Sequence, residues 1–271
     1  MSARHRPTVT VWLVGTILAA LLSAAPVRAA EVAVRQAEGV TRGFLVLRTL
    51  AGEILAEGDL LQTTKPEGVQ SRLTFRFRDG SLFDETVVFS QRRVFTMLRY
   101  RLEQRGPSFP GDLEISLERD RGRGRYVVTS RRHGGEAERV SGETELPPDV
   151  YNGMTIMLLR NLAGTAETVH TLAFTPAPTL VQLELIPRGE EPIAVGERRV
   201  AATHYVLTPK LGMLRGAVAA VLGKTPSDYH CWIVTAGVPA FVAIDGPLFA
   251  GGPIWRVETV SPRSPARAEA R

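Results

Sequence analysis

The chain has 271 residues and a mass of 29.6 kDa, and 44% of its residues are hydrophobic and 23% charged. This composition excludes a largely disordered chain, and the polar interruptions after residue 30 exclude a polytopic membrane protein. A single cysteine, Cys231, excludes a disulfide scaffold and a cysteine-based zinc finger. The 25 glycines and 18 prolines indicate many turns and short strands.

The N-terminus predicts export. Arg4 and Arg6 precede an uncharged apolar stretch at 11–25, and small residues then lead to Ala29. This pattern is typical of a secretory signal peptide, here residues 1–29. The alternative is an uncleaved membrane anchor, but Pro26 breaks the apolar stretch just before the cleavage-like site. We therefore expect a periplasmic or secreted protein with no transmembrane segment after cleavage.

Cleavage also changes the charge of the protein. Removal of the three arginines in residues 1–29 lowers the formal net charge from +5 to about +2. The arginine-rich stretch 119–125 is diluted by acidic residues and carries no aromatic side chain on which a base could stack. We interpret it as a solvated hairpin tip, and no nucleic-acid partner is expected.

Residues 30–260 are predicted to form one β-rich domain, followed by a disordered tail at 261–271. Alternating apolar residues, with glycine and proline in the turns between them, mark the strands. Residues 211–222 are apolar and fit either a short helix or a buried loop. The predicted strands are 43–48, 54–62, 73–77, 81–90, 93–102, 113–117, 126–130, 167–174, 179–186, 198–207, 229–235, 240–244 and 253–260.

The turn at Asp79-Gly80 fixes the register of one hairpin. A two-residue loop would place Phe75 opposite Asp84 and mix the two faces of the hairpin. A three-residue loop with Gly80 in the left-handed conformation puts the apolar residues of both strands on one face. We predict the three-residue loop, which leaves Glu85 on the apolar face. A rim position with the carboxylate in water is favoured there over a functional inward acid.

One helix is predicted at about 148–162. Proline suits its first turn, Asp149 complements the helix dipole, and Gly164 suits its end. Beyond Asp149 the segment carries one charged residue, Arg160, and apolar residues cover most of its circumference. A helix of this kind is buried. The fold predicted is therefore mainly β: a curved antiparallel sheet or partly open β-barrel clasping one apolar α-helix.

The segment Leu146-Pro147-Pro148-Asp149 with the helix after it, and the Asp79-Gly80-Ser81 hairpin, resemble uncharacterised exported β-rich proteins of bacterial envelopes. The resemblance takes in most of residues 40–260. It implies a periplasmic curved sheet around a helix. It implies no catalytic residues.

The aromatic strand faces and the apolar helix suggest a cavity for an apolar molecule, although an ordinary filled core gives the same pattern. The candidate ligand-binding residues are Phe75, Phe77, Phe83, Phe89, Met154, Met157, Leu158 and Trp232. The polar candidates are Glu85, His204 and His230.

No catalytic, metal-binding or cofactor motif is present. His230 and Cys231 are neighbours on a strand and point to opposite faces, so they cannot form a local dyad. A buried, inert thiol is the preferred interpretation of Cys231, and a hydrogen-bonded core residue that of His204.

The favoured function is a periplasmic binding or carrier module for a lipid-like or other apolar ligand. One alternative is a structural or interaction protein of the cell envelope, using edge strands or the arginine-rich hairpin against an envelope protein. A second is an enzyme without a recognisable motif, which convergence of Glu85, His204, His230 and Asp149 in one cleft would support. A cavity of roughly 300 Å³ or more between helix and sheet would favour the carrier.

Overall fold

The structure is a computed structural model that describes residues 31–174, 177–196, 198–210 and 226–260. The predicted signal peptide at 1–29, the ambiguous segment at 211–222 and the tail at 261–271 lie outside the described residues. The described part of the chain is mainly β, with one short α-helix, and all of its named strands belong to one antiparallel sheet of 14 strands.

Neighbouring strands of the sheet are also consecutive in the chain, except that β1 pairs with β14. Their bounds are β1 (Thr41–Thr49), β2 (Ile54–Lys65), β3 (Gly68–Phe77), β4 (Leu82–Gln91), β5 (Phe95–Arg105), β6 (Gly111–Asp120), β7 (Arg123–Arg132), β8 (Ala137–Glu145), α1 (Thr155–Leu162), β9 (Glu167–Phe174), β10 (Pro178–Val195), β11 (Arg198–Lys210), β12 (Tyr229–Val234), β13 (Ala240–Gly246) and β14 (Trp255–Thr259). The spatial order is β8-β7-β6-β5-β4-β3-β2-β1-β14-β13-β12-β11-β10-β9.

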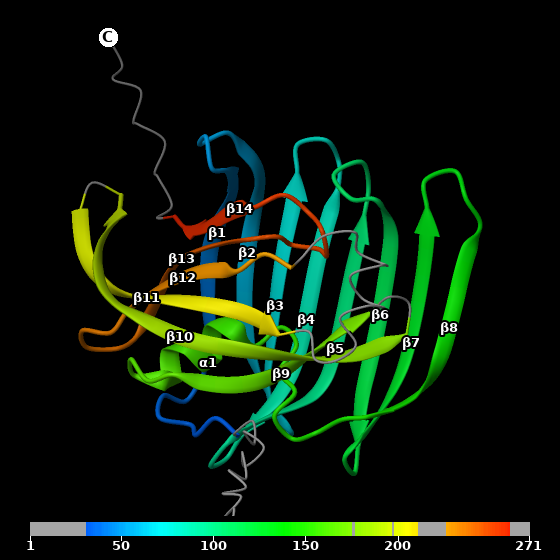
Figure 1. Ribbon diagram of the computed structural model, residues 1–271, viewed down its shortest axis with the longest axis horizontal. Helices are drawn as coiled ribbons and strands as arrows, with labels where there is room; N and C mark the ends of the chain where they lie inside the picture. The colour runs from blue at the N-terminus through cyan, green and yellow to red at the C-terminus, as the bar shows by residue number, and fades with distance from the viewer. Residues whose placement is uncertain (1–30, 175–176, 197, 211–225, 261–271) are drawn as a thin grey trace, which may run out of the picture.

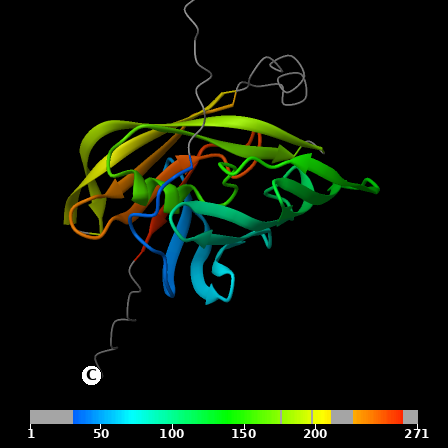
Figure 2. The ribbon, with the colours of Figure 1, turned by 90° about the horizontal axis from the view of Figure 1, so that it is seen from below.

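The sheet curves back on itself and encloses the helix. In Figure 1 the strands β2 to β8 stand nearly upright at the back, and β9 to β11 cross in front of them. Seen from below, the two halves form two layers with the helix between them (Figure 2). The named strands do not close into a barrel, because β8 and β9 remain the two edges. The predicted curved antiparallel sheet around an apolar helix is confirmed.

The β3–β4 hairpin has the predicted three-residue loop. Phe75 lies opposite Phe83, and the Phe77 amide donates a hydrogen bond to the Ser81 carbonyl at 2.9 Å. Gly80 has a φ of +83°, which glycine adopts without strain. The apolar residues of both strands therefore face the interior, and Glu85, opposite Leu73, lies on the same face.

The helix is shorter than predicted: it begins at Thr155, not at about 148. Gly153 has a φ of +71°, which an α-helix cannot contain, and Val150 instead forms a parallel bridge with His170 of β9. Pairing with an edge strand thus replaces the first two predicted turns. The short helix is nevertheless buried, through Met157, Leu158, Leu159, Asn161 and Leu162.

Strand β8 was not predicted, and it pairs with β7 along its whole length. Its sequence, AERVSGETE, has only Val140 as a large apolar residue, and most of its side chains are exposed. This is the pattern of an edge strand that has no core face to fill. Its charged side chains also discourage pairing with another strand.

Residues 31–38, here called the N-terminal strap, tie the start of the described chain to the helix. The backbone amides of Arg35 and Gln36 both donate to Oδ1 of Asn161, at 2.8 and 2.7 Å. Arg160 donates from Nη1 to both carboxylate oxygens of Glu38 at 2.8 Å. The helix is thereby held from a second side, by chain that lies outside the sheet.

Candidate functional site

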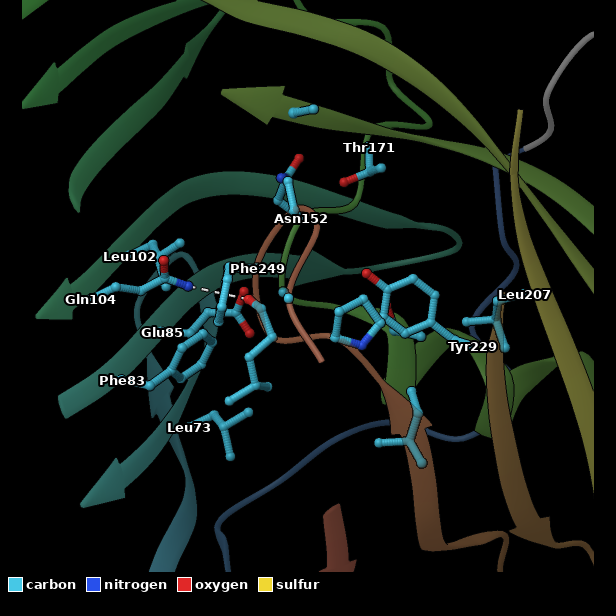
Figure 3. Close-up of a pocket in the computed structure, with 18 of the residues that line it drawn as sticks. Leu73, Phe83, Glu85, Leu102, Gln104, Asn152, Thr171, Leu207, Tyr229 and Phe249 are labelled. Carbon is cyan, nitrogen blue, oxygen red and sulfur yellow. Dashed lines mark hydrogen bonds between the residues drawn. The ribbon is translucent and has the colours of Figure 1, made fainter. Parts of the chain in front are cut away.

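A cavity of about 660 Å³ lies between the two halves of the sheet, next to the N-terminal end of the helix. One wall comes from β3, β4 and β5, and the facing wall from β9 to β13; Figure 3 shows Glu85 and Phe83 on one side and Tyr229 and Leu207 on the other. The lining is predominantly apolar. The volume falls within the range of small-molecule sites and exceeds what a packed core leaves empty.

Glu85 places a carboxyl group in this apolar lining. It lies in the interior, and the surface that it keeps faces the cavity. The hydroxyl of Tyr100, on the neighbouring strand β5, donates to its Oε1 at 3.0 Å. No other side chain or backbone group of the described residues donates to this carboxyl. Its position corrects the expectation of a rim residue in water: the other half of the sheet covers the face on which it lies.

The environment of Glu85 favours its neutral form. Burial raises the pKa of the carboxyl from 4.5 to about 7, and the hydrogen bond from Tyr100 only partly offsets this. Burial also raises the pKa of Tyr100 well above 10, and the Glu85 charge adds to the effect. On the facing wall the same two causes raise the pKa of Tyr229 to about 12. Glu85 is therefore the group in the cavity that titrates near neutrality.

Gly153 makes room for this carboxyl. Its φ is positive, and a Cβ built there would lie 3.3 Å from Cδ of Glu85 and 3.3 Å from the Tyr100 ring. The same glycine that delays the helix thus lets the backbone approach the acid closely.

Two amide side chains of the lining, Asn152 and Gln104, are engaged by the backbone. Asn152 donates from Nδ2 to the Leu172 carbonyl at 2.8 Å and accepts from the Leu172 amide at 2.9 Å. Gln104 donates from Nε2 to the Leu248 carbonyl at 3.1 Å. These contacts hold the loops that border the cavity, so the two side chains have structural roles.

The predicted site residues are distributed over three locations. Phe83, Met157 and Glu85 line the cavity. Most of the remaining aromatic and apolar candidates fill the core around it without lining it, because their neighbours pack directly on them; these are Phe75, Phe77, Phe89, Met154 and Leu158. Trp232, His204 and His230 lie on the outer face of the sheet, where even-numbered residues of β11 and β12 point.

The outer face carries a compact polar cluster. Nε2 of His204 and Nδ1 of His230 share a hydrogen bond at 3.0 Å, and the His204 ring stacks on Trp232 with centroids 4.9 Å apart. Glu191 accepts from Trp232 at 3.2 Å and contacts Nδ1 of His204 at 3.0 Å. His204 is thus hydrogen-bonded as expected, but on the outer face.

Asp149 lies neither at the cavity nor in the cluster on the outer face. It is buried and pairs with Nδ1 of His170 at 2.9 Å, which supports the bridge between residues 149–151 and β9. The four residues whose convergence would support an enzyme therefore occupy three places. The described residues also contain no group of three or more His, Cys, Asp or Glu side chains placed to hold a metal ion.

The arginine-rich hairpin, predicted to be a solvated tip, makes several contacts with the rest of the protein. Its Arg119 is half-buried and donates to the carbonyls of Met97, Leu146 and Pro147 at 2.5–2.9 Å. Arg125 pairs with Glu118 across the hairpin. Arg119 therefore joins the turn to the segment before the helix, which removes one of the charges available to a partner.

Tyr100 and Tyr229 are the lining residues of most chemical interest that the sequence analysis missed. A bulge between Val88 and Phe89 shifts the pairing of β4 with β5, so that Met97 and Tyr100 both face inward although their numbers differ in parity. The alternation of Tyr100 with Arg99 and Arg101 is the signal that could have identified the tyrosine as inward-facing.

We expect the stability of the fold to fall as Glu85 loses its proton. Between pH 4.5 and about 7 the folded state keeps a proton that the unfolded state has released, so the free energy of unfolding decreases with rising pH and then levels off. Glu85→Gln removes this dependence. Over that range the wild type should lose on the order of 2 kcal/mol more than the variant, as measured by urea unfolding.

The control for this experiment is Glu114→Gln, which alters an exposed glutamate on β6 and should follow the wild type. Parallel pH curves for the wild type and Glu85→Gln would contradict the assignment.

Cys231 is expected to be unreactive in the folded protein. It is fully buried on the inner face of β12, and burial raises the pKa of its thiol well above the ordinary value. An aromatic disulfide reagent at pH 8 should therefore label it only after denaturation. Rapid labelling of the native protein would show that this strand opens.

Comparisons with known proteins identify no family. No family model and no curated protein matches the sequence. Among solved structures, the chain is similar to a β-barrel-like protein of a domain of unknown function, DUF1849, from Brucella abortus, with 10% identity and a TM-score of 0.43. The match covers 83% of this chain and 98% of that one. Within the described residues, no helix has the length and apolar character needed to cross a membrane.

Proposed function

We propose that this protein binds and carries a small apolar or amphipathic molecule in the cavity between the two halves of its sheet. The observation that supports the proposal is the volume of about 660 Å³ with a predominantly apolar lining. An unfilled apolar cavity of this size lowers the free energy of unfolding, because the side chains of its walls lose packing contacts. A ligand that fills the cavity restores those contacts.

The proposal includes export. The leader pattern at 1–29 supports a location in the periplasm or outside the cell, as does the resemblance to exported envelope proteins. The mass of the protein isolated from the periplasm should correspond to a chain that begins at Ala30. A protein that keeps residues 1–29 would contradict cleavage.

The test of binding is a fluorescence titration with N-phenyl-1-naphthylamine, a neutral apolar dye that brightens on leaving water. We expect saturable binding at one site of the full chain. The double variant Leu73→Trp with Leu183→Trp places an indole ring on each facing wall of the cavity. Because the rings occupy space in the cavity, binding should weaken at least tenfold.

The matched control places the same two rings on the outside. Leu61 of β2 and Leu180 of β10 are exposed, so Leu61→Trp with Leu180→Trp adds the same side chains outside the cavity and should leave binding unchanged. Absence of saturable dye binding to the wild type, or equal binding by the two double variants, would overturn the proposal.

A further inference from the structure

The cavity carries one ionisable carboxyl and, among the described lining residues, no cationic side chain. Glu85 accepts one hydrogen bond, from Tyr100 on β5. The two amide side chains of the lining, Asn152 and Gln104, donate to backbone carbonyls. A carboxylate at this position is thus incompletely solvated by the protein, and a buried charge without a partner is costly.

A ligand can supply the missing partner. An anionic head group, such as that of a fatty acid, would meet Glu85 as a like charge or require both acids to stay protonated. An uncharged alcohol would offer one donor. A protonated amine offers several donors together with the opposite charge, and charge-assisted hydrogen bonds are the strongest of these options.

We propose that the cavity selects cationic amphiphiles, with the alkyl chain against the apolar walls and a protonated amine at the Glu85 carboxylate. This inference rests on the proposed function, because it names the head group of the ligand that the cavity would hold. Gly153 contributes by leaving the side of the carboxyl open, since any larger residue would crowd Cδ of Glu85.

The ion pair makes binding depend on pH. Among the described residues, the titratable groups that face the carboxyl are Tyr100 from β5 and Tyr229 from β12. Burial raises the pKa of both, so they stay neutral below pH 9. Alkylamines remain protonated in this range. Since the pKa of Glu85 is about 7 in the free cavity, amine binding must displace a proton at pH 6 but hardly any at pH 8. Amine affinity should therefore rise about tenfold from pH 6 to pH 8.

The experiment compares dodecylamine, dodecanol and dodecanoate as competitors of N-phenyl-1-naphthylamine, each below its critical micelle concentration or its solubility limit. For the wild type at pH 8 we expect dodecylamine to bind at least tenfold more tightly than either other ligand. Glu85→Gln, which keeps an acceptor for Tyr100, should lose both this preference and its pH dependence while still binding dodecanol. Glu114→Gln is the matched surface control and should behave as the wild type.

The outcomes separate the two proposals. If the dye does not bind, or none of the three ligands displaces it, the carrier function itself fails. If all three displace it equally, or dodecanoate displaces it best, the cavity binds amphiphiles but the selection for a cation is refuted. An amine preference that survives in Glu85→Gln also refutes the role of this carboxyl. Dodecanol binding by Glu85→Gln shows that the variant has kept its fold.

Discussion

Replacing Arg160 with methionine is expected to lower the free energy of unfolding by about 3–5 kcal/mol. The guanidinium donates from Nη1 to both oxygens of Glu38 and from Nε to the Pro239 carbonyl at 2.8 Å. Because the Glu38 side chain is only 2% exposed, the substitution leaves a buried carboxylate without its counter-charge. Urea unfolding at pH 7 measures the loss.

The double variant Arg160→Met with Glu38→Gln should recover part of this loss, since it removes both charges. Arg101→Met is the matched control, because Arg101 pairs with Glu114 on the surface with both side chains more than half exposed. Such a pair contributes less than about 1 kcal/mol. Equal losses for Arg160→Met and Arg101→Met would show that the N-terminal strap is not anchored as described.

Gly58→Ala is expected to destabilise the fold by about 3 kcal/mol. A Cβ at Gly58 would lie 2.4 Å from Cε1 of Phe75 and 2.9 Å from the Thr74 carbonyl oxygen. Phe75 is fully buried and packs against Phe83, so its ring can make room for the methyl group only by displacing packed neighbours. Thermal and urea unfolding of the variant should both show the loss.

Gly43→Ala is the control for this substitution. Gly43 lies on the adjacent strand and the same face, but its nearest neighbour, Cβ of Leu60, would be 3.9 Å from the new methyl group. The change should be neutral or slightly stabilising, since alanine restricts the unfolded chain. Gly58→Ala with Phe75→Leu should be more stable than the sum of the two single effects implies. If Gly58→Ala is as stable as Gly43→Ala, the ring does not pack as described.

Local patterns were sufficient to predict the sheet and one register. The alternation around Phe75 and Phe83 and the chemistry of Asp79-Gly80 determine which face of that hairpin is apolar, and the structure agrees. These features depend only on near neighbours in the chain. The strand β8 was missed because its sequence lacks alternating apolar residues, as an exposed edge strand can.

The helix start and the site depend on distant contacts. Whether residues 148–154 become helical depends on β9, which pairs with Val150, and on the positive φ of Gly153. The inward face of β4 could be predicted, but not that the other half of the sheet would cover Glu85. On β12 both faces carry large side chains, Tyr229 inside and Trp232 outside, so alternation alone could not say which one meets the cavity.

The unjoined edges of the sheet have a mechanical consequence. Strands β8 and β9 share no ladder, so no inter-strand hydrogen bond between them opposes bending of the two halves toward or away from each other. A sealed cylinder resists such bending, since its circumference is fixed by its strand pairing. The strand pairing alone therefore does not fix the width of the space inside this protein.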